Sequence, residues 1–306
     1  MKDFILKALR KTTSDKLYYQ CRYLFKHGEL LNLNHPTTFN AKLIWLNLYD
    51  RKPEYAYFVD KYTAREYIRR RIGEQYLNDL YGVYDRVDAI DFSKLPDSFV
   101  LKATHGSGWV IVCNDKSKLD VEAARREMNS WLNQNFYDLY GEWVYKDLKP
   151  RIICEKFLHN KNESGLTDYK FYCFHGIPRF VQVDMDRGTN HTRTYFDLFW
   201  KRIHFELGGC PARDEEIPCP ETFDEMLRIV RILCHGFKFI RVDLYEVEGQ
   251  LIFGELTLFS GNGMLNFSPK SFDTKIGSCL KIEETETLEE QAVRVCNSIY
   301  KKSDTK

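Results

Sequence analysis

Apolar and polar residues alternate along much of this chain, and the alternation predicts a series of short strands. The clearest pair spans residues 240–258, where the side chains change face with a period of two. Arg241 and Asp243 share one face of the first strand, and Glu255 and Thr257 share one face of the second. Two acids therefore lie among large apolar residues, where a carboxylate needs a specific partner.

The connection between these strands decides whether the two acids meet. A three-residue loop at 248–250 makes Val247 and Leu251 partners and places Asp243 directly opposite Glu255. A two-residue turn at 248–249 is also compatible with the sequence. That turn places the two acids on opposite faces unless a bulge intervenes, and the sequence leaves both registers open.

In the first register the two side chains start roughly 5 Å apart, so their like charges repel unless a cation lies between them. A divalent ion supplies that charge, because Mg²⁺ prefers oxygen ligands and binds through one or two carboxylates together with substrate phosphates. Arg241 is the alternative cation. The pattern therefore fits either a metal–nucleotide site or a structural hairpin paired by arginine.

Strand and helix patterns mix along the whole chain, which predicts an α+β or α/β protein. We expect three regions: a mostly helical one over 1–98, a small subdomain with a phosphate loop over 99–158, and a larger subdomain with the metal hairpin over 159–306. The pattern predicts a helix over 58–73, a linker at 91–99, strands at 99–103 and 109–115, a helix at 120–136, a strand at 151–158, a hairpin over 168–186, and helices at 220–235 and 288–302.

Composition restricts the partners. The formal net charge of the 306 residues is +1, so no global field favours nucleic acid. No window approaches the ~20 apolar residues of a membrane span, so we expect no integral membrane segment. The nine cysteines are scattered without metal-type spacing, which is typical of reduced thiols in a cytoplasmic protein. The oligomeric state stays open.

A second motif is the stretch FVLKATHGSGWVIV at 99–112, which reads as strand, glycine loop and strand. Gly106 and Gly108 add no Cβ bulk, so backbone N–H groups in the loop can approach phosphates, and Lys102 can supply charge. No GK[ST] follows, so the loop is not a Walker A motif. An ordinary hairpin with a glycine turn is the alternative, in which His105 is only a loop residue.

Two further stretches carry weaker signals. In RIICEKFL, a strand ends at Glu155, where a carboxylate and exposed backbone can read an adenine edge; a surface acid is the alternative. In DYKF, Asp168 and Lys170 share one strand face and suit ribose and phosphate. An exposed ion pair, worth under ~1 kcal/mol, is the alternative there.

The order of these motifs resembles the ATP-grasp family, from about Asp60 to Gly263. The resemblance implies a nucleotide held between two α+β subdomains, with ATP and Mg²⁺ as cofactors. It implies phosphate binding by Lys102 and by the loop residues Thr104, His105, Gly106, Ser107 and Gly108. It implies adenine contacts from Glu155, Lys156, Phe157 and Leu158, a ribose contact from Asp168, and a phosphate contact from Lys170. It marks Asp243 and Glu255 as magnesium ligands, Lys102, Lys170 and Arg241 as catalytic, and Lys61 as a weaker nucleotide candidate.

More narrowly, HPTTFNAKLIWLNLYD at 35–50, together with the motifs above, resembles the teichuronopeptide-biosynthesis-type, TupA-like subgroup. This implies ATP-dependent amide formation, through an acylphosphate, between an amine and a carboxylate such as a uronic acid in surface polysaccharide. The usual family hairpin has Asn two residues after the Glu, but here that position is Thr257, so either Thr257 or Asn262 would replace it as a ligand. We expect the substrate near Arg187 and the turn residues Ser260, Gly261, Asn262 and Gly263.

Two other activities fit parts of the sequence. Asp184 and Asp186 form a D-x-D motif, which in a glycosyltransferase holds a metal and a sugar nucleotide. That activity requires a different fold. The second is an ATP-grasp kinase, in which a sugar hydroxyl attacks the γ-phosphate.

Overall fold

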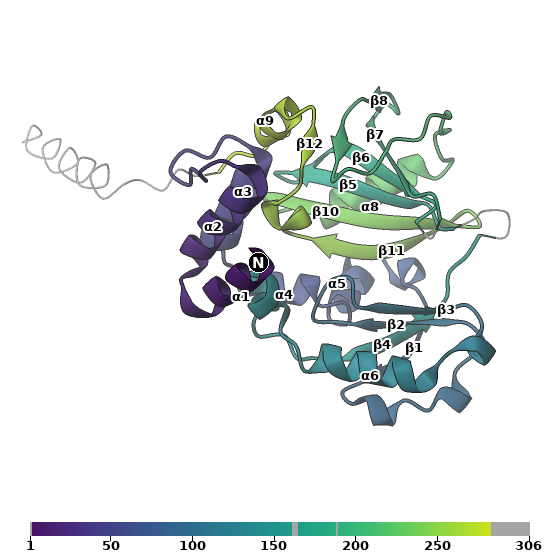
Figure 1. Cartoon of the computed structure of the whole chain (residues 1–306). Coiled ribbons are helices and arrows are strands. Elements are labelled where there is room, and N and C mark those ends of the chain that lie inside the picture. The colour runs from purple at the N-terminus through teal and green to yellow at the C-terminus, as the bar shows by residue number, and fades with distance from the viewer. Residues whose placement is uncertain (1, 161–164, 188, 283–306) are drawn as a thin grey trace, which may run out of the picture.

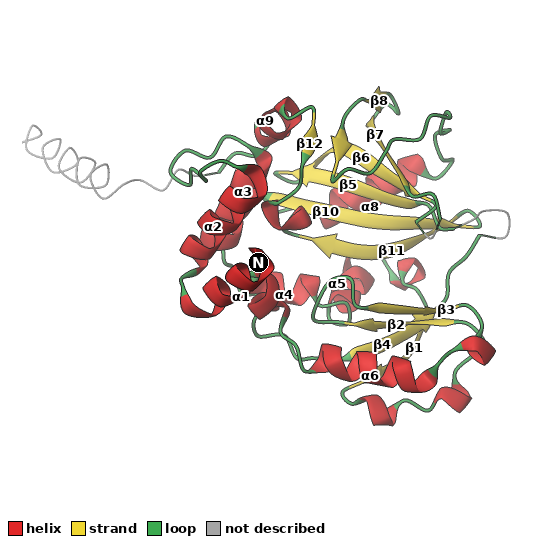
Figure 2. Cartoon of the chain, in the orientation of Figure 1, coloured by secondary structure: helices red, strands yellow, loops and turns green. Residues whose placement is uncertain are grey.

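A computed structural model describes residues 2–160, 165–187 and 189–282. It confirms the α+β class: a four-stranded and a six-stranded antiparallel sheet face one another, with helices packed around them (Figures 1 and 2). The helix predicted at 288–302 lies outside the described residues.

The small sheet forms around the predicted phosphate loop. Its strand order is β1 (Leu80–Tyr84), β4 (Ile152–Lys156), β2 (Phe99–Ala103) and β3 (Val110–Cys113). Helix α6 (Val121–Leu132) covers its outer face with Ala124, Met128 and Trp131, which recur one helical turn apart (Figure 1). Asp120 begins the helix by accepting a hydrogen bond from the Ala123 amide at 2.8 Å.

Residues before position 99 take part in this sheet. β1 is its edge strand, paired with β4, although strand β1 falls within the region expected to be mostly helical. The predicted linker at 91–99 is wrong in one respect, because Phe92 and Leu95 are buried in the core of the small sheet. The boundary at residue 98 therefore separates β1 from its sheet, and the three-part division itself stays a prediction.

The large sheet carries the predicted acidic hairpin. Its order is β11 (Gln250–Thr257), β10 (Phe239–Val247), β5 (Asp168–Phe174), β6 (Ile177–Met185), β7 (Thr192–Asp197) and β8 (Arg202–Ile203). One face is apolar and packs on α8 (Phe223–Leu233), which lies behind the sheet in Figure 1. The opposite face is polar, since residues of one parity on β5, β6, β10 and β11 are mostly charged or hydrogen-bonding.

The helices α1 (Lys2–Thr12), α2 (Asp15–His27) and α3 (Phe39–Tyr49) form the N-terminal region, followed by α4 (Glu54–Val59) and α5 (Ala64–Arg71). Asn40 at the start of α3 donates from Nδ2 to Asp273 and to the Leu265 carbonyl, both at 2.8 Å. The N-terminal region is thereby tied to the chain that follows β11. The remaining described α-helices and strands are α7 (Phe136–Tyr140), β9 (Glu206–Leu207), β12 (Phe267–Ser268) and α9 (Ser271–Gly277).

Among the described residues, no helix has both the length and the apolar character that a bilayer crossing requires.

Gly263 packs directly against α3, and this close approach predicts a measurable cost of adding a side chain. A Cβ there would lie 2.6 Å from Ile44 Cγ1 and 2.7 Å from the Asn40 carbonyl oxygen. Gly28 has a similar positive φ but no atom within 4 Å of its Cβ position. We expect Gly263→Ala to lower the free energy of unfolding by about 1–3 kcal/mol more than Gly28→Ala. Urea denaturation measures both, and equal losses would contradict the packing argument.

Candidate functional site

A cleft of about 560 Å³ lies between the two sheets. Both sheets contribute to its walls, and most of the residues predicted for nucleotide binding lie along it. The small-sheet side provides Lys102, Ser107, Gly108, Trp109, Val110, Glu155, Lys156, Phe157 and Leu158, and the large-sheet side provides Lys170, Tyr172, Gln182, Arg187, Arg193, Arg241, Tyr245, Phe253, Gly254, Glu255, Ser260 and Gly261.

The acidic hairpin brings its two carboxylates face to face through one of the connections that the sequence left open, the two-residue turn with a bulge. The turn has two residues, Glu248 and Gly249, both with positive φ, so the three-residue loop is wrong. A bulge at Gly254 then shifts the register by one residue and restores Asp243 opposite Glu255. A Cβ on Gly254 would lie 3.0 Å from the Asp243 carbonyl oxygen, so glycine permits the bulge.

Arg241 lies between the two acids. Its Nε donates to Asp243 Oδ1 at 2.7 Å, and one terminal nitrogen donates to both Asp243 Oδ2 at 2.6 Å and Glu255 Oε1 at 2.9 Å. Burial raises the pKa of Asp243, but Arg241 and Lys170 more than offset this and hold that pKa below its ordinary value. The structure therefore realises the arginine-paired hairpin that the sequence left open.

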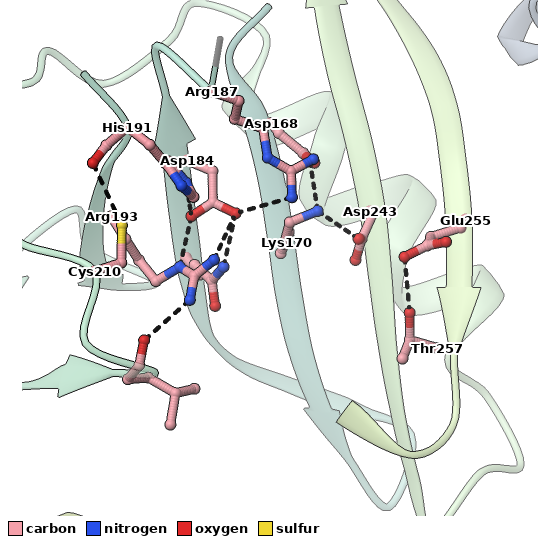
Figure 3. A network of polar contacts seen from close by, with 12 residues as sticks. Asp168, Lys170, Asp184, Arg187, His191, Arg193, Cys210, Asp243, Glu255 and Thr257 are labelled. Atoms are coloured by element: carbon pink, nitrogen blue, oxygen red, sulfur yellow. Dashed lines mark hydrogen bonds and ion pairs between the residues drawn. The ribbon is translucent and has the colours of Figure 1, made fainter. Parts of the chain in front are cut away.

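Lys170 extends this network across the sheet. Its Nζ donates to Asp243 at 2.6 Å and to Asp168 at 2.5 Å (Figure 3). Asp168 is fully buried and does not line the cleft, so a contact between its side chain and a ribose is not supported. Burial raises the pKa of Asp168 to about 6, although the positive charge of Lys170 acts in the opposite direction. Asp168 serves as a counter-ion for Lys170 and for Arg187, which donates to it at 3.1 Å.

The glycine loop divides into an inner and an outer part. Ser107 and Gly108 line the cleft, whereas Thr104 and His105 are buried. The His105 ring lies 3.0 Å from the Trp131 carbonyl oxygen, at the end of α6, and does not line the cleft, so this geometry does not support the predicted phosphate contact of its side chain. Lys61 fixes the position of this loop, because its Nζ donates a hydrogen bond to the Gly106 carbonyl at 2.5 Å.

Glu155 stands at the other end of the small sheet with both oxygens engaged. Lys102 Nζ donates to Oε2 at 2.7 Å, and Arg65 donates to Oε1 at 3.0 Å. Beyond it, the Lys156 amide donates to Asp79 and the Lys156 carbonyl accepts from Asn78. The backbone of Lys156 is therefore already bonded, which leaves Phe157 and Leu158 as the cleft-lining backbone beyond β4.

The residues of the predicted substrate turn also divide into two that line the cleft and two that do not. Ser260 and Gly261 line the cleft, and the Ser260 hydroxyl accepts from Arg241 at 3.3 Å. Asn262 points away: its Oδ1 accepts from the Tyr19 hydroxyl at 2.6 Å, and its Nδ2 donates to the Tyr140 carbonyl at 2.6 Å. Gly263 packs on α3. Both residues therefore pack on neighbouring helices and do not line the cleft, and this orientation does not support the predicted metal-ligand role of Asn262.

Comparison with known proteins now decides the family. The family model described as TupA-like ATPgrasp matches residues 41–281. The chain belongs to the TupA-like ATP-grasp family. A search of curated proteins gives no match.

Solved structures similar to this TupA-like protein include D-alanine–D-alanine ligase from Bacillus anthracis, with 18% identity over 66% of this chain and a TM-score of 0.40. Another is the L-amino acid ligase from Bacillus licheniformis, with 11% identity over 86% of this chain and a TM-score of 0.45. A third is the ATP-grasp ligase PsnB with its minimal precursor, Mg and ADP, with 14% identity over 82% of this chain and a TM-score of 0.37. The chain spans 57%, 61% and 64% of these three chains, respectively.

ATP with Mg²⁺ is the cofactor pair of ATP-grasp enzymes, and the hairpin of this TupA-like protein offers suitable oxygen donors. Glu255 lines the cleft with 38% of its side chain exposed, and its hydrogen bonds to Arg241 and Thr257, both within the described part of the chain, engage Oε1. Asp243 is covered by Arg241 and Lys170, so it becomes a ligand only if Arg241 moves. Thr257 donates to Glu255 Oε1 at 3.2 Å and does not line the cleft, so it supports Glu255 (Figure 3).

The D-x-D motif serves the fold of the TupA-like protein. The buried Asp184 accepts from Arg193 Nε at 2.7 Å (Figure 3) and from Gln182 at 3.0 Å. Asp186 accepts from Arg213 at 2.9 Å. Both acids are therefore engaged by protein cations, and the glycosyltransferase alternative, which needed another fold, is not supported.

Several cleft residues were missed at the level of sequence. Arg65 was missed although the helix predicted over 58–73 would place it one turn after Lys61. That continuous helix is wrong, because Lys61 lies in the turn between α4 and α5, yet both residues line the cleft. Asn78 and Trp109 gave no signal, because their place in the cleft depends on tertiary packing.

The buried pair of Asp184 and Arg193 predicts a pH-dependent stability. Burial raises the pKa of Asp184, but its hydrogen bond and charge interaction with Arg193 lower it below 3.8 overall. This pair therefore contributes its full stability above pH 3.8, the ordinary pKa of the carboxyl, and the contribution is lost as the pH falls through the lowered pKa of the folded protein.

We expect Asp184→Asn to lower the free energy of unfolding by about 3 kcal/mol at pH 7, and the difference from wild type to shrink towards pH 3. Asp186→Asn is the control, because its more exposed pair should contribute under about 1 kcal/mol. Urea denaturation between pH 3 and pH 7 measures both variants. A difference for Asp184→Asn that stays constant over this range would contradict the prediction.

Proposed function

We propose that this protein is an ATP-dependent ligase that joins an amine to a carboxylate through an acylphosphate. The observation that carries the proposal is the arrangement of the cleft. The lysine-led glycine loop and the acidic hairpin, far apart in the sequence, form opposite walls of one cavity. We further propose that the carboxylate belongs to a uronic acid or similar sugar acid of surface polysaccharide, as the family resemblance implies. A cytoplasmic location, where ATP is supplied, fits this reaction.

The nucleotide has a natural orientation in this cleft. Apolar side chains near Phe157 and Leu158, including Val100 and Val112, suit the adenine ring. The triphosphate would extend past Lys102, Ser107 and Gly108 toward Lys170 and Arg241 on the other wall. Glu255, and Asp243 once uncovered, would hold Mg²⁺ beside the phosphates, where the ion supplies charge neutralisation.

The reaction begins with the meeting of two anions, so charge neutralisation by the protein dominates its rate. A carboxylate oxygen attacks the γ-phosphorus, the bond from that phosphorus to the β–γ bridging oxygen breaks, and an acylphosphate and ADP form. The amine then attacks the acyl carbon, loses a proton and displaces inorganic phosphate. Lys102 and Lys170 spread the phosphate charge, and Arg241 faces the reacting end of the cleft.

The acceptor would lie beyond the phosphates, next to Ser260 and Gly261. Arg187 borders this part of the cleft with half of its side chain exposed, and Arg193 lies beside it. Both guanidinium groups are paired with buried acids, so their net field is smaller than two full charges. An acidic sugar matches this environment better than a basic substrate does.

Phosphate release measured across a matrix of uronic acid sugars and amines tests the proposal. We expect free phosphate and a new amide only when ATP, Mg²⁺, a carboxylate and an amine are all present. Lys102→Met should lower this rate by about 10²-fold or more, because a phosphate-facing cation is lost. Lys94→Met is the control, since its ammonium lies on the surface and, within the described ranges, its ion pair is with Asp91. A phosphorylated acceptor without phosphate release would instead identify a kinase of a sugar hydroxyl.

A further inference from the structure

Arg241 occupies the position that a cation bridging Asp243 and Glu255 would need. Its guanidinium bonds to both carboxylates, and Arg241 and Glu255 line the cleft whereas Asp243 does not. From the cleft, an ion therefore meets the arginine before it meets Asp243. Only 13% of the Arg241 side chain and 1% of the Asp243 side chain are exposed.

The contacts of Arg241 oppose its displacement by a metal ion alone. Three charge-assisted hydrogen bonds of 2.6 to 2.9 Å reach the two acids, and a fourth bond reaches the Ser260 hydroxyl. Released without a new partner, the guanidinium would remain largely buried and unpaired, which is strongly unfavourable. Mg²⁺ also gives up its own water reluctantly. Neither half of such an exchange is favourable by itself.

A triphosphate in the cleft changes this balance. Phosphate oxygens accept bidentate hydrogen bonds from arginine, so the guanidinium can exchange carboxylate oxygens for phosphate oxygens without becoming unpaired. The two carboxylates are then left facing one another, and their repulsion favours a dication that the same phosphates bring with them. One movement of Arg241 thus couples nucleotide binding to metal binding.

We propose that Arg241 is a built-in counter-cation that closes the metal site in the nucleotide-free protein and transfers to the phosphates when the metal–nucleotide complex binds. The hairpin then binds a divalent ion weakly by itself and tightly with nucleotide. By linkage, metal and nucleotide strengthen the binding of each other by the same factor. This inference rests on the proposed function for the identity of the cleft ligand.

Mn²⁺ binding, followed by electron paramagnetic resonance, tests the closed state without any nucleotide. We expect nucleotide-free Arg241→Gln to bind Mn²⁺ about tenfold or more tightly than wild type, because the two facing carboxylates lose their cation. The double variant Arg241→Gln with Glu255→Gln should return to the weak binding of wild type. Arg213→Gln, which removes an arginine paired with Asp186 elsewhere, should leave Mn²⁺ binding unchanged.

A second arm adds a non-hydrolysable ATP analogue. Wild type should then bind Mn²⁺ tightly, and Glu255→Gln should lose this gain while keeping the weak nucleotide-free binding. This arm keeps the inference testable if Arg241→Gln fails to fold. Tight Mn²⁺ binding by nucleotide-free wild type, or no gain in a folded Arg241→Gln, would overturn the inference. Failure of the analogue to bind at all would instead overturn the proposed function and leave the nucleotide-free result standing.

Discussion

The structure depends on two carboxylates held opposite one another on neighbouring strands. Asp243 and Glu255 face each other across β10 and β11, where like charges repel unless a cation compensates them. Arg241 supplies that charge within the hairpin, and Lys170 supplies more from β5. The polar face of the large sheet follows from this need, because each added cation is balanced by a further acid along β5 and β6.

The same constraint explains the surroundings of the site. The Ser260 turn accepts a hydrogen bond from Arg241 on one side, while Asn262 and Gly263 are held by α2 and α3 on the other. Among the described residues, none before Lys61 lines the cleft, and the N-terminal helices act on it through their contacts with this turn. On the opposite wall of the cleft, the glycine loop between β2 and β3 is supported comparably, because Lys61 donates to the Gly106 carbonyl.

Much of this arrangement follows from residue patterns. The strand at 99–103 is predicted to the residue, because a compact apolar run ends at a glycine loop. The facing of Asp243 and Glu255 is one of the outcomes that the sequence leaves open, and it arises from the two-residue turn together with the bulge at Gly254. A bulge depends on how a strand packs against its neighbours, and a single sequence carries little sign of it. His105, Asp168 and Asn262 are buried and do not line the cleft, and the sequence does not reveal this, because alternation gives a face but does not say whether that face reaches the cleft or a buried partner.

The most direct measurement is a crystal structure of the protein with Mn²⁺ and a non-hydrolysable ATP analogue, with the ion located by its anomalous scattering. We expect an anomalous peak between Asp243 and Glu255, the triphosphate beside Lys102 and Gly108, and the Arg241 guanidinium moved from Asp243 to the phosphates. A nucleotide bound outside the cleft, or an ion bound elsewhere while Arg241 still bridges the two acids, would contradict it.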